Sequence, residues 1–96
     1  MNYNIKPLIW EKDKFDDYFA SVTYCSGYGV NDVYVKYYVS KFTDGKFHAC
    51  SSNTIEIDWH KEFDTAKLAQ EYVQEIHSEV IRKFISDLFK YIEVID

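Results

Sequence analysis

The chain has 96 residues, of which 47% are hydrophobic and 19% aromatic, and its formal net charge is −5. This length predicts a single domain over residues 1–96. The acidic balance argues against nucleic acid as a direct partner, because such binding needs clustered Lys and Arg to displace counterions. No apolar stretch approaches the roughly eighteen residues of a membrane-spanning helix. The two cysteines, Cys25 and Cys50, and the absence of a leader-like start favour a cytoplasmic protein with reduced thiols.

The first two thirds of the sequence predict antiparallel strands, because apolar and polar residues alternate between turn-forming residues. In the strongest strand, Tyr34 and Tyr38 occupy the face opposite to the valines. Asp44-Gly45 follows it and is typical of a tight hairpin turn, because this pair tolerates positive φ at both central positions. The predicted strands are residues 5–11, 18–25, 33–42, 47–50 and 55–59.

The apolar spacing in residues 63–92 predicts one long helix. Asp64 is expected to cap its first turn, with Phe63 and Leu68 at the two hydrophobic staple positions. Apolar residues recur at spacings of three and four, and from Ile76 at a constant spacing of four, so the apolar stripe spirals around the helix. Strands followed by one helix predict an α+β fold: an antiparallel sheet of three to five strands packed on one long C-terminal helix.

The predicted helix is longer than the predicted strands. It spans roughly 40 Å, whereas a typical strand spans about 17 to 20 Å. Its second half is therefore expected to extend beyond the sheet. We expect Ile81, Ile85 and Phe89 to be buried there against a second chain, either another copy in a homodimer or a target protein.

Two pairs of metal-ligating residue types have strand spacing. His48 and Cys50 are two residues apart, as are Asp58 and His60, and four such groups form tetrahedral zinc sites in other proteins. The sequence has neither CxxC nor HxxxH spacing, and partly exposed strand residues are the simpler interpretation. We therefore expect no metal and no cofactor.

The residues 27–29, Gly-Tyr-Gly, resemble the start of a phosphate-binding loop. They lack the third Gly, the Lys and the following helix that such loops need, so a flexible hairpin loop is the better interpretation. The sequence also contains no set of nucleophile, base and orienting group, so we expect no enzymatic activity.

Tyr34 and Tyr38, with Lys36 between them, form an aromatic face that Tyr18 or Tyr24 of a neighbouring strand could extend. Tyr is enriched at the centres of protein interfaces, which favours a contact surface. A platform for stacking single-stranded bases is less favoured, because such sites also need a positively charged groove and this protein is acidic. The remaining alternative is that a Tyr face lies under the helix.

Glu71, Glu75 and Glu79 are four residues apart and form an acidic line on the helix, opposite the apolar stripe. Most such lines are solvated faces, here with Lys83 four residues after Glu79. A functional interpretation is that the line imitates a phosphate row or steers the protein toward a basic surface.

Two segments, IKPLIWE at 5–11 and FDTAKLAQ at 63–70, resemble small uncharacterised phage and prophage proteins. Those proteins begin with a proline-leucine-x-tryptophan-glutamate strand, continue through a Tyr/Trp-rich antiparallel sheet and end in a helix. The likeness covers most of the chain in layout and these two segments in detail. It implies an accessory protein without a known reaction, a class in which small acidic inhibitors of host defence, including anti-CRISPR-like proteins, recur.

The leading hypothesis is a phage-type, non-enzymatic binding protein that blocks a host protein complex by steric occlusion, the complex being one of defence or of nucleic-acid handling. The alternatives are a small-molecule or metal-binding module that uses the Tyr-rich face with His48 and His60, and a homodimeric structural module. The predicted partner-binding residues are Tyr34, Tyr38, Glu71, Glu75, Glu79, Ile81, Phe84, Ile85 and Phe89.

Overall fold

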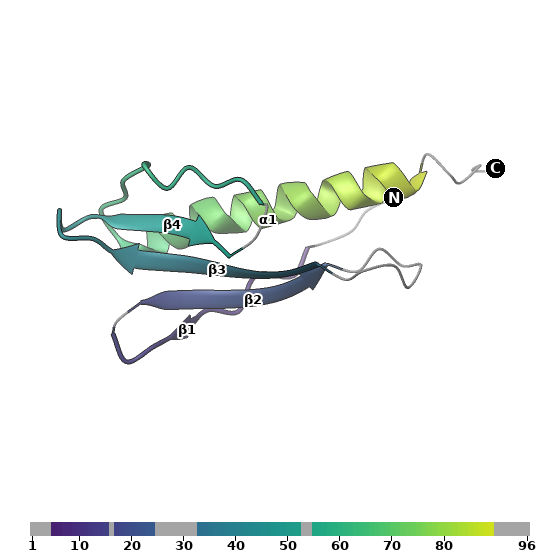
Figure 1. The fold of residues 1–96 in the computed structure, drawn as a ribbon. Helices are drawn as coiled ribbons and strands as arrows, with labels where there is room; N and C mark the ends of the chain where they lie inside the picture. The colour runs from purple at the N-terminus through teal and green to yellow at the C-terminus, as the bar shows by residue number, and fades with distance from the viewer. Residues whose placement is uncertain (1–4, 16, 25–32, 53–54, 90–96) are drawn as a thin grey trace.

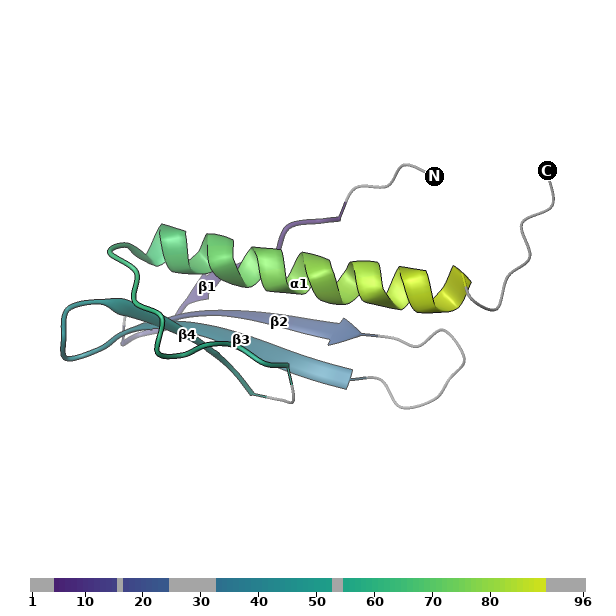
Figure 2. The ribbon, with the colours of Figure 1, turned by 90° about the horizontal axis from the view of Figure 1, so that it is seen from above.

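The computed structural model describes residues 5–15, 17–24, 33–52 and 55–89. Four antiparallel strands form one sheet in the order β1-β2-β3-β4, and a helix packs across one of its faces (Figures 1 and 2). This is the predicted α+β fold. The elements are β1 Glu11–Lys12, β2 Tyr18–Tyr24, β3 Val33–Lys41, β4 Phe47–Ser51 and α1 Ala66–Phe89.

The alternation of β3 divides the sheet into an inner and an outer face. Val35, Tyr37 and Val39 are fully buried and belong to one hydrophobic cluster with residues of α1. Tyr34, which points the other way, is 55% exposed, and Tyr38 is half-buried. The helix therefore covers the inner face, since the β3 side chains of that face are buried against Ala69 and Val73 of α1.

The predicted first strand is wrong over most of its length, since only Glu11–Lys12 pairs with β2. Leu8 instead donates its backbone N–H to Oε1 of Gln74 on α1, at 2.7 Å. Leu8 and Trp10 are partly buried and pack against the core cluster. Pro7 has no N–H to offer a ladder, so a short edge strand after it costs no hydrogen bond.

The predicted strand over 55–59 is also wrong. The backbone N–H of Asp58 is 3.2 Å from the hydroxyl of Tyr72, and the N–H of His60 donates to Oδ1 of Asp58 at 3.1 Å. These side-chain acceptors replace the carbonyls of a neighbouring strand. Only Phe63, at the end of the segment, forms a backbone bridge to β4, with Phe47.

The β3–β4 hairpin is present but its loop differs from the expected one. Gly45 donates its N–H to the carbonyl of Phe42 at 3.0 Å, and Phe42 donates to the carbonyl of Lys46 at 2.9 Å. These two bonds close a three-residue loop over 43–45, with Gly45 in the left-handed region at φ 81°. A type I turn followed by a left-handed glycine produces this pattern, whereas a two-residue turn needs positive φ at both central residues.

We expect Gly45→Ala to lower the free energy of unfolding by about 1 kcal/mol, because a Cβ is disfavoured in the left-handed region. Packing does not contribute, since nothing lies within 4 Å of a Cβ built at Gly45. Gly45→Asn is the matched control. Its free energy of unfolding should fall by less, because Asn adopts the left-handed conformation more readily than Ala. Urea unfolding of the three proteins measures the difference, and an alanine variant as stable as the wild type would contradict it.

The helix begins at Ala66, after a cap that the sequence analysis placed one residue too early. The side-chain oxygen of Thr65 accepts from the N–H of Leu68 at 3.2 Å, which makes Thr65 the N-cap. Asp64 instead forms an ion pair with Nζ of Lys46. With the cap at Thr65, Phe63 and Leu68 no longer occupy staple positions, and Leu68 is 46% exposed.

The sheet follows the helix farther than expected. The 24 residues of α1 span roughly 36 Å, and the nine residues of β3 already span about 30 Å. At the end of β2, the ring of Tyr24 lies 5.6 Å from that of His77 and 5.8 Å from that of Phe84. The predicted overhang of the whole second half is therefore wrong, because the sheet accompanies α1 at least as far as Phe84.

Three buried polar groups meet in the core. The Tyr24 hydroxyl lies 2.6 Å from the Tyr37 hydroxyl and 2.8 Å from Nδ1 of His77. Every group is satisfied when Tyr37 donates to Tyr24 and Tyr24 donates to a neutral imidazole. Burial raises the pKa of both tyrosines and lowers the pKa of His77, so each group stays neutral in the folded state.

Acidification should destabilise the protein through His77. The unfolded chain binds a proton at this residue near pH 6.5, whereas the folded state resists it, so stability is full above that pH and falls below it. We expect the free energy of unfolding to fall by up to about 1.4 kcal/mol for each pH unit below 6.5, until the pH reaches the pKa of His77 in the folded state. Urea unfolding between pH 7.5 and 5 measures it, and His77→Asn, which keeps an acceptor but does not titrate, is the control. If the difference in free energy between the two proteins is constant over this range, the prediction is wrong.

Candidate functional site

A groove lies between α1 and the segment that follows β4. It consists of two adjoining pockets of about 310 and 300 Å³, which share Ile55, Val80 and Lys83. Ile76, Val80 and Phe84 come from successive turns of the helix, because a spacing of four returns to nearly the same side. The lining residues are Ile55, Glu56, Ile76, Glu79, Val80, Lys83 and Phe84.

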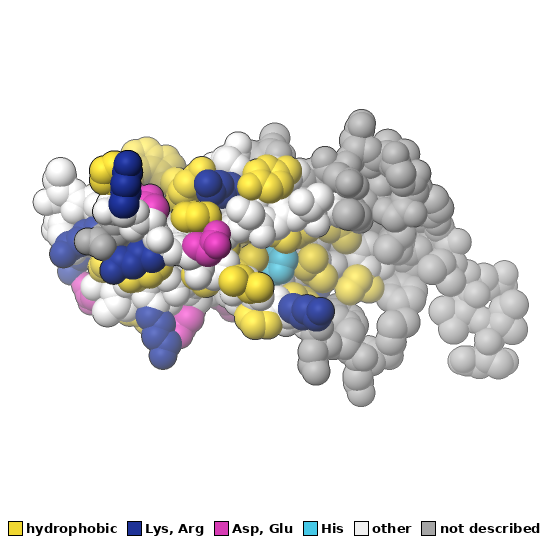
Figure 3. Space-filling view, turned by 90° about the horizontal axis from the view of Figure 1, so that it is seen from below, with side chains coloured by type: hydrophobic (Ala, Val, Ile, Leu, Met, Phe, Trp, Pro, Cys, Tyr) yellow, Lys and Arg dark blue, Asp and Glu magenta, His cyan; other side chains and the backbone are white. Residues whose placement is uncertain are grey.

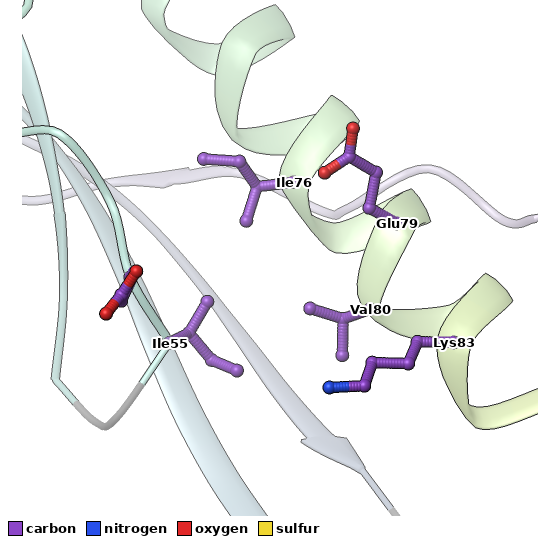
Figure 4. A pocket seen from close by; sticks show the side chains of 6 residues that line it. Ile55, Ile76, Glu79, Val80 and Lys83 are labelled. Atoms are coloured by element: carbon purple, nitrogen blue, oxygen red, sulfur yellow. The ribbon is translucent and has the colours of Figure 1, made fainter. Parts of the chain in front are cut away.

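Ile55 forms the opposite wall of the groove. It lies there because residues 55–59 do not form a strand. The hydroxyl of Ser51 donates to the carbonyl of Ile55 at 2.8 Å and holds the chain at the end of β4. Figure 4 shows Ile55 pointing across the groove toward Val80, with the Lys83 side chain reaching into the same space. Apolar side chains therefore form the walls and charged ones the border.

Phe84 is the largest apolar side chain of the groove. It remains 38% exposed although its ring packs at 5.8 Å against that of Tyr24. A large aromatic surface at the edge of an apolar groove is the arrangement that anchors protein contacts. Phe84 is among the partner-binding residues predicted from the sequence, whereas Ile55, Ile76 and Val80 are not, because their convergence depends on the path of the chain after β4.

The acidic line of Glu71, Glu75 and Glu79 is exposed, as expected. Glu79 lines the groove, so the line runs along α1 and ends at the groove border. The charge of the helix surface next to the groove is consequently negative, with Lys83 as the cation beside it.

The outer face of the sheet carries a second aromatic surface. Nζ of Lys36 lies 4.3 Å from the ring centroid of Phe19 and 5.5 Å from that of Tyr38. The Tyr34 hydroxyl donates to Oγ of Ser21 at 3.1 Å. The neighbour of Tyr38 in β2 is therefore Phe19, set by the register of the two strands.

The expected extension of this face by Tyr18 or Tyr24 is wrong, since Tyr24 is buried and Tyr18 packs against the core. The two tyrosines lie on the inner face, and so does Tyr37. One set of tyrosines therefore lies under the helix, whereas Tyr34 and Tyr38 are partly exposed on the outer face, where a contact surface stays a prediction.

The predicted partner-binding residues lie on two separate surfaces. Tyr34 and Tyr38 are on the outer sheet face, whereas Phe84 is on the helix beyond the inner face. Ile81 and Ile85 are half-buried, and Ile81 packs against the core cluster. The side chain of Phe89 lies outside the described residues.

A third surface is seen from the side of β1. Figure 3 shows hydrophobic side chains gathered around a histidine near the middle of this face, and most of the charged side chains toward its left end.

The structure does not assemble His48, Cys50, Asp58 and His60. His60 is exposed, stacks on Trp59 at a centroid distance of 3.7 Å, and pairs with Asp58 at 3.6 Å. Cys50 is an exposed free thiol. Cys25 and residues 27–29 lie outside the described part of the chain.

His48 instead belongs to a different cluster, at the β3–β4 turn. The imidazole is 6% exposed, its Nδ1 lies 2.8 Å from the carbonyl of Trp59, and its Nε2 lies 3.1 Å from Oδ2 of Asp44. The Trp59 carbonyl raises the pKa of His48, opposed by burial and assisted by the Asp44 carboxylate. Hydrogen bonds from Lys46 and His48 lower the pKa of Asp44.

Comparisons of the chain with known protein families, with curated proteins and with solved structures gave no match. In the part of the chain that the structure describes, no helix is both long enough and apolar enough to cross a membrane.

Proposed function

We propose that this chain is a non-enzymatic, phage-type binding protein that blocks a host protein complex by occupying one of its surfaces. The groove between Ile55 and α1 is the observation that carries the proposal. Its walls offer apolar atoms that a partner side chain can desolvate, and this is where binding free energy concentrates in protein interfaces. The resemblance of residues 5–11 and 63–70 to phage accessory proteins supports a host protein as the partner.

The partner surface is basic and presents an apolar anchor side chain. Glu71, Glu75 and Glu79 lead to the groove border, and a positive surface approaching along them is attracted before it makes contact. The net charge of −5 acts in the same direction. Such steering raises the association rate, whereas the apolar anchor sets the lifetime of the complex.

The blocking function is tested in bacterial strains that each carry one defined defence system and are challenged with a phage that this system restricts. Expression of the chain should raise the plating efficiency in at least one strain. The purified target from that strain should bind the chain directly, as measured by calorimetry. If no strain responds, the proposed blocking of defence is wrong.

Phe84→Ser should weaken binding to that target about tenfold or more, because it removes the anchor surface of the groove. Leu68→Ser is the matched control: it removes a leucine that is 46% exposed on the same helix but outside the groove. Circular dichroism establishes that both variants fold. Equal affinity of the two variants would exclude the groove as the binding surface.

Glu79→Lys should slow association and reduce its dependence on salt, since it reverses the charge at the groove border. Glu11→Lys changes the net charge equally on the exposed strand β1 and should have a smaller effect.

A homodimer remains the second candidate, because the same groove could receive another copy of α1. Light scattering distinguishes the two. A dimer that Phe84→Ser converts into a folded monomer would assign the groove to a second copy of the chain rather than to a host protein.

A further inference from the structure

The β3–β4 turn and the segment before α1 bring three potential metal ligands together. Ligand atoms of Asp44, His48 and Glu62 all lie within 4.8 Å of one another. Among the described His, Cys, Asp and Glu residues, this is the one group of three or more with such spacing. It lies beside the start of α1, at the end of the molecule where β3 turns into β4 (Figure 1).

The buried His48 ring is held with one nitrogen toward the two carboxylates. Its Nδ1 faces the Trp59 carbonyl at 2.8 Å, and a carbonyl only accepts, so Nδ1 carries a hydrogen. The Phe42 ring stacks on the imidazole at a centroid distance of 4.1 Å and an interplanar angle of 15°. A histidine whose other nitrogen donates to a backbone carbonyl is the usual form of a metal-binding histidine, because the tautomer and the ring orientation are both fixed.

Asp44 presents one oxygen to this nitrogen and uses the other to hold the turn. Oδ1 accepts from the N–H of Lys46 at 2.7 Å, and Oδ2 lies 3.1 Å from Nε2 of His48. In a tetrahedral zinc site with bonds of 2.0 to 2.1 Å, two ligand atoms are about 3.3 Å apart. The His48 and Asp44 atoms, which a hydrogen bond joins at 3.1 Å, have nearly this separation, and zinc would take the place of the proton on Nε2.

The third ligand is placed by backbone pairing. Phe47 and Phe63 form an antiparallel bridge, with N···O distances of 2.8 and 3.0 Å, so Glu62 lies opposite His48 across the two strands. Glu62 is exposed, and its carboxylate interacts electrostatically with His48 and Lys46. The ion pair of Lys46 is with Asp64.

We propose that Asp44, His48 and Glu62 form a three-ligand site for Zn²⁺, with the fourth position open to water or to a ligand from a partner. One imidazole nitrogen and two carboxylate oxygens suit zinc, whereas Mg²⁺ and Ca²⁺ prefer oxygen ligands alone. The ion joins the turn to residue 62, and thereby fastens the segment before the helix to the edge of β4. This inference is independent of the proposed host partner.

Calorimetric titration of the metal-free protein with Zn²⁺ at pH 7 tests the site, and Mg²⁺ is the comparison ion. We expect one Zn²⁺ per chain and no Mg²⁺ binding. Saturating Zn²⁺ should raise the melting temperature by several degrees, because the ion binds the folded state in preference.

Two substitutions remove a ligand without removing the local structure. Asp44→Asn keeps an oxygen that can accept from Lys46 and so preserves the turn, and Glu62→Gln changes an exposed side chain. Each should weaken zinc binding about tenfold or more and abolish the zinc-dependent rise in melting temperature. His60→Asn and Cys50→Ser are the controls, since both residues are exposed possible ligands outside the cluster.

If the protein binds no zinc at 100 μM, there is no site. If His60→Asn or Cys50→Ser removes the binding and Asp44→Asn and Glu62→Gln leave it unchanged, the zinc is held elsewhere on the surface and the proposal is wrong.

Discussion

The packing of α1 onto the inner face of β3 is the contact on which the rest of the structure depends. Val35, Tyr37 and Val39 are fully buried beneath the helix, and so are Ala69 and Val73 on the helix side. A domain of this size buries a smaller share of its unfolded-chain surface than a large domain does, so few residues are fully buried. The segments at the border of this two-layer unit combine apolar packing against the core with polar contacts to α1, as Leu8 does through Gln74. Loss of the helix–sheet contact would therefore release those segments as well.

Apolar burial alone does not determine where the helix lies along the sheet, because it has no direction. The hydrogen bonds among Tyr24, Tyr37 and His77 do, since each requires a specific distance and orientation. Tyr24 is the last residue of β2, so this network fixes the middle of α1 over the end of the sheet. It also places Phe84, two turns further, against the Tyr24 ring. The groove thus takes its position from a polar contact in the core.

The parts of the fold that follow local rules could be predicted from the sequence. The alternation in β2 and β3 and the apolar stripe of α1 depend on neighbours within a few residues, and the structure has these elements close to the predicted bounds. The hairpin at Asp44-Gly45 is also present, with a three-residue loop in place of the expected two-residue turn. The predictions are wrong where the local structure depends on a contact with a residue far away in the sequence. Alternation over 55–59 predicts a strand, but the N–H of Asp58 finds the hydroxyl of Tyr72 instead. Similarly, Asp64 has the right side chain for an N-cap and pairs with Lys46.

The candidate sites could be predicted only in part from the sequence, because they too depend on contacts between residues far apart in the chain. Phe84 and the acidic line follow from helical spacing, and the structure leaves them exposed as that spacing implies. Ile55 reaches the groove because Ser51 holds its carbonyl, and Glu62 reaches His48 because Phe47 bridges Phe63. No sequence motif indicates either the Ser51–Ile55 or the Phe47–Phe63 contact. Strand spacing in the sequence points to His48, Cys50, Asp58 and His60, from which no metal is predicted, whereas the structure groups His48 with Asp44 and Glu62.

The segment between β4 and α1 contributes to both proposed sites. Its first described part supplies Ile55 to the groove, and its last part supplies Glu62 to the zinc site. Between them, the segment has no strand partner in the described structure and is held by side chains, such as the Tyr72 hydroxyl. A region with few backbone bonds opens at a lower free energy than the sheet that it borders. Zinc at Glu62 would restrain one end of this segment, and a partner at Ile55 the other. Because each restraint reduces the conformational entropy that the second must overcome, occupation of either site is expected to favour occupation of the other.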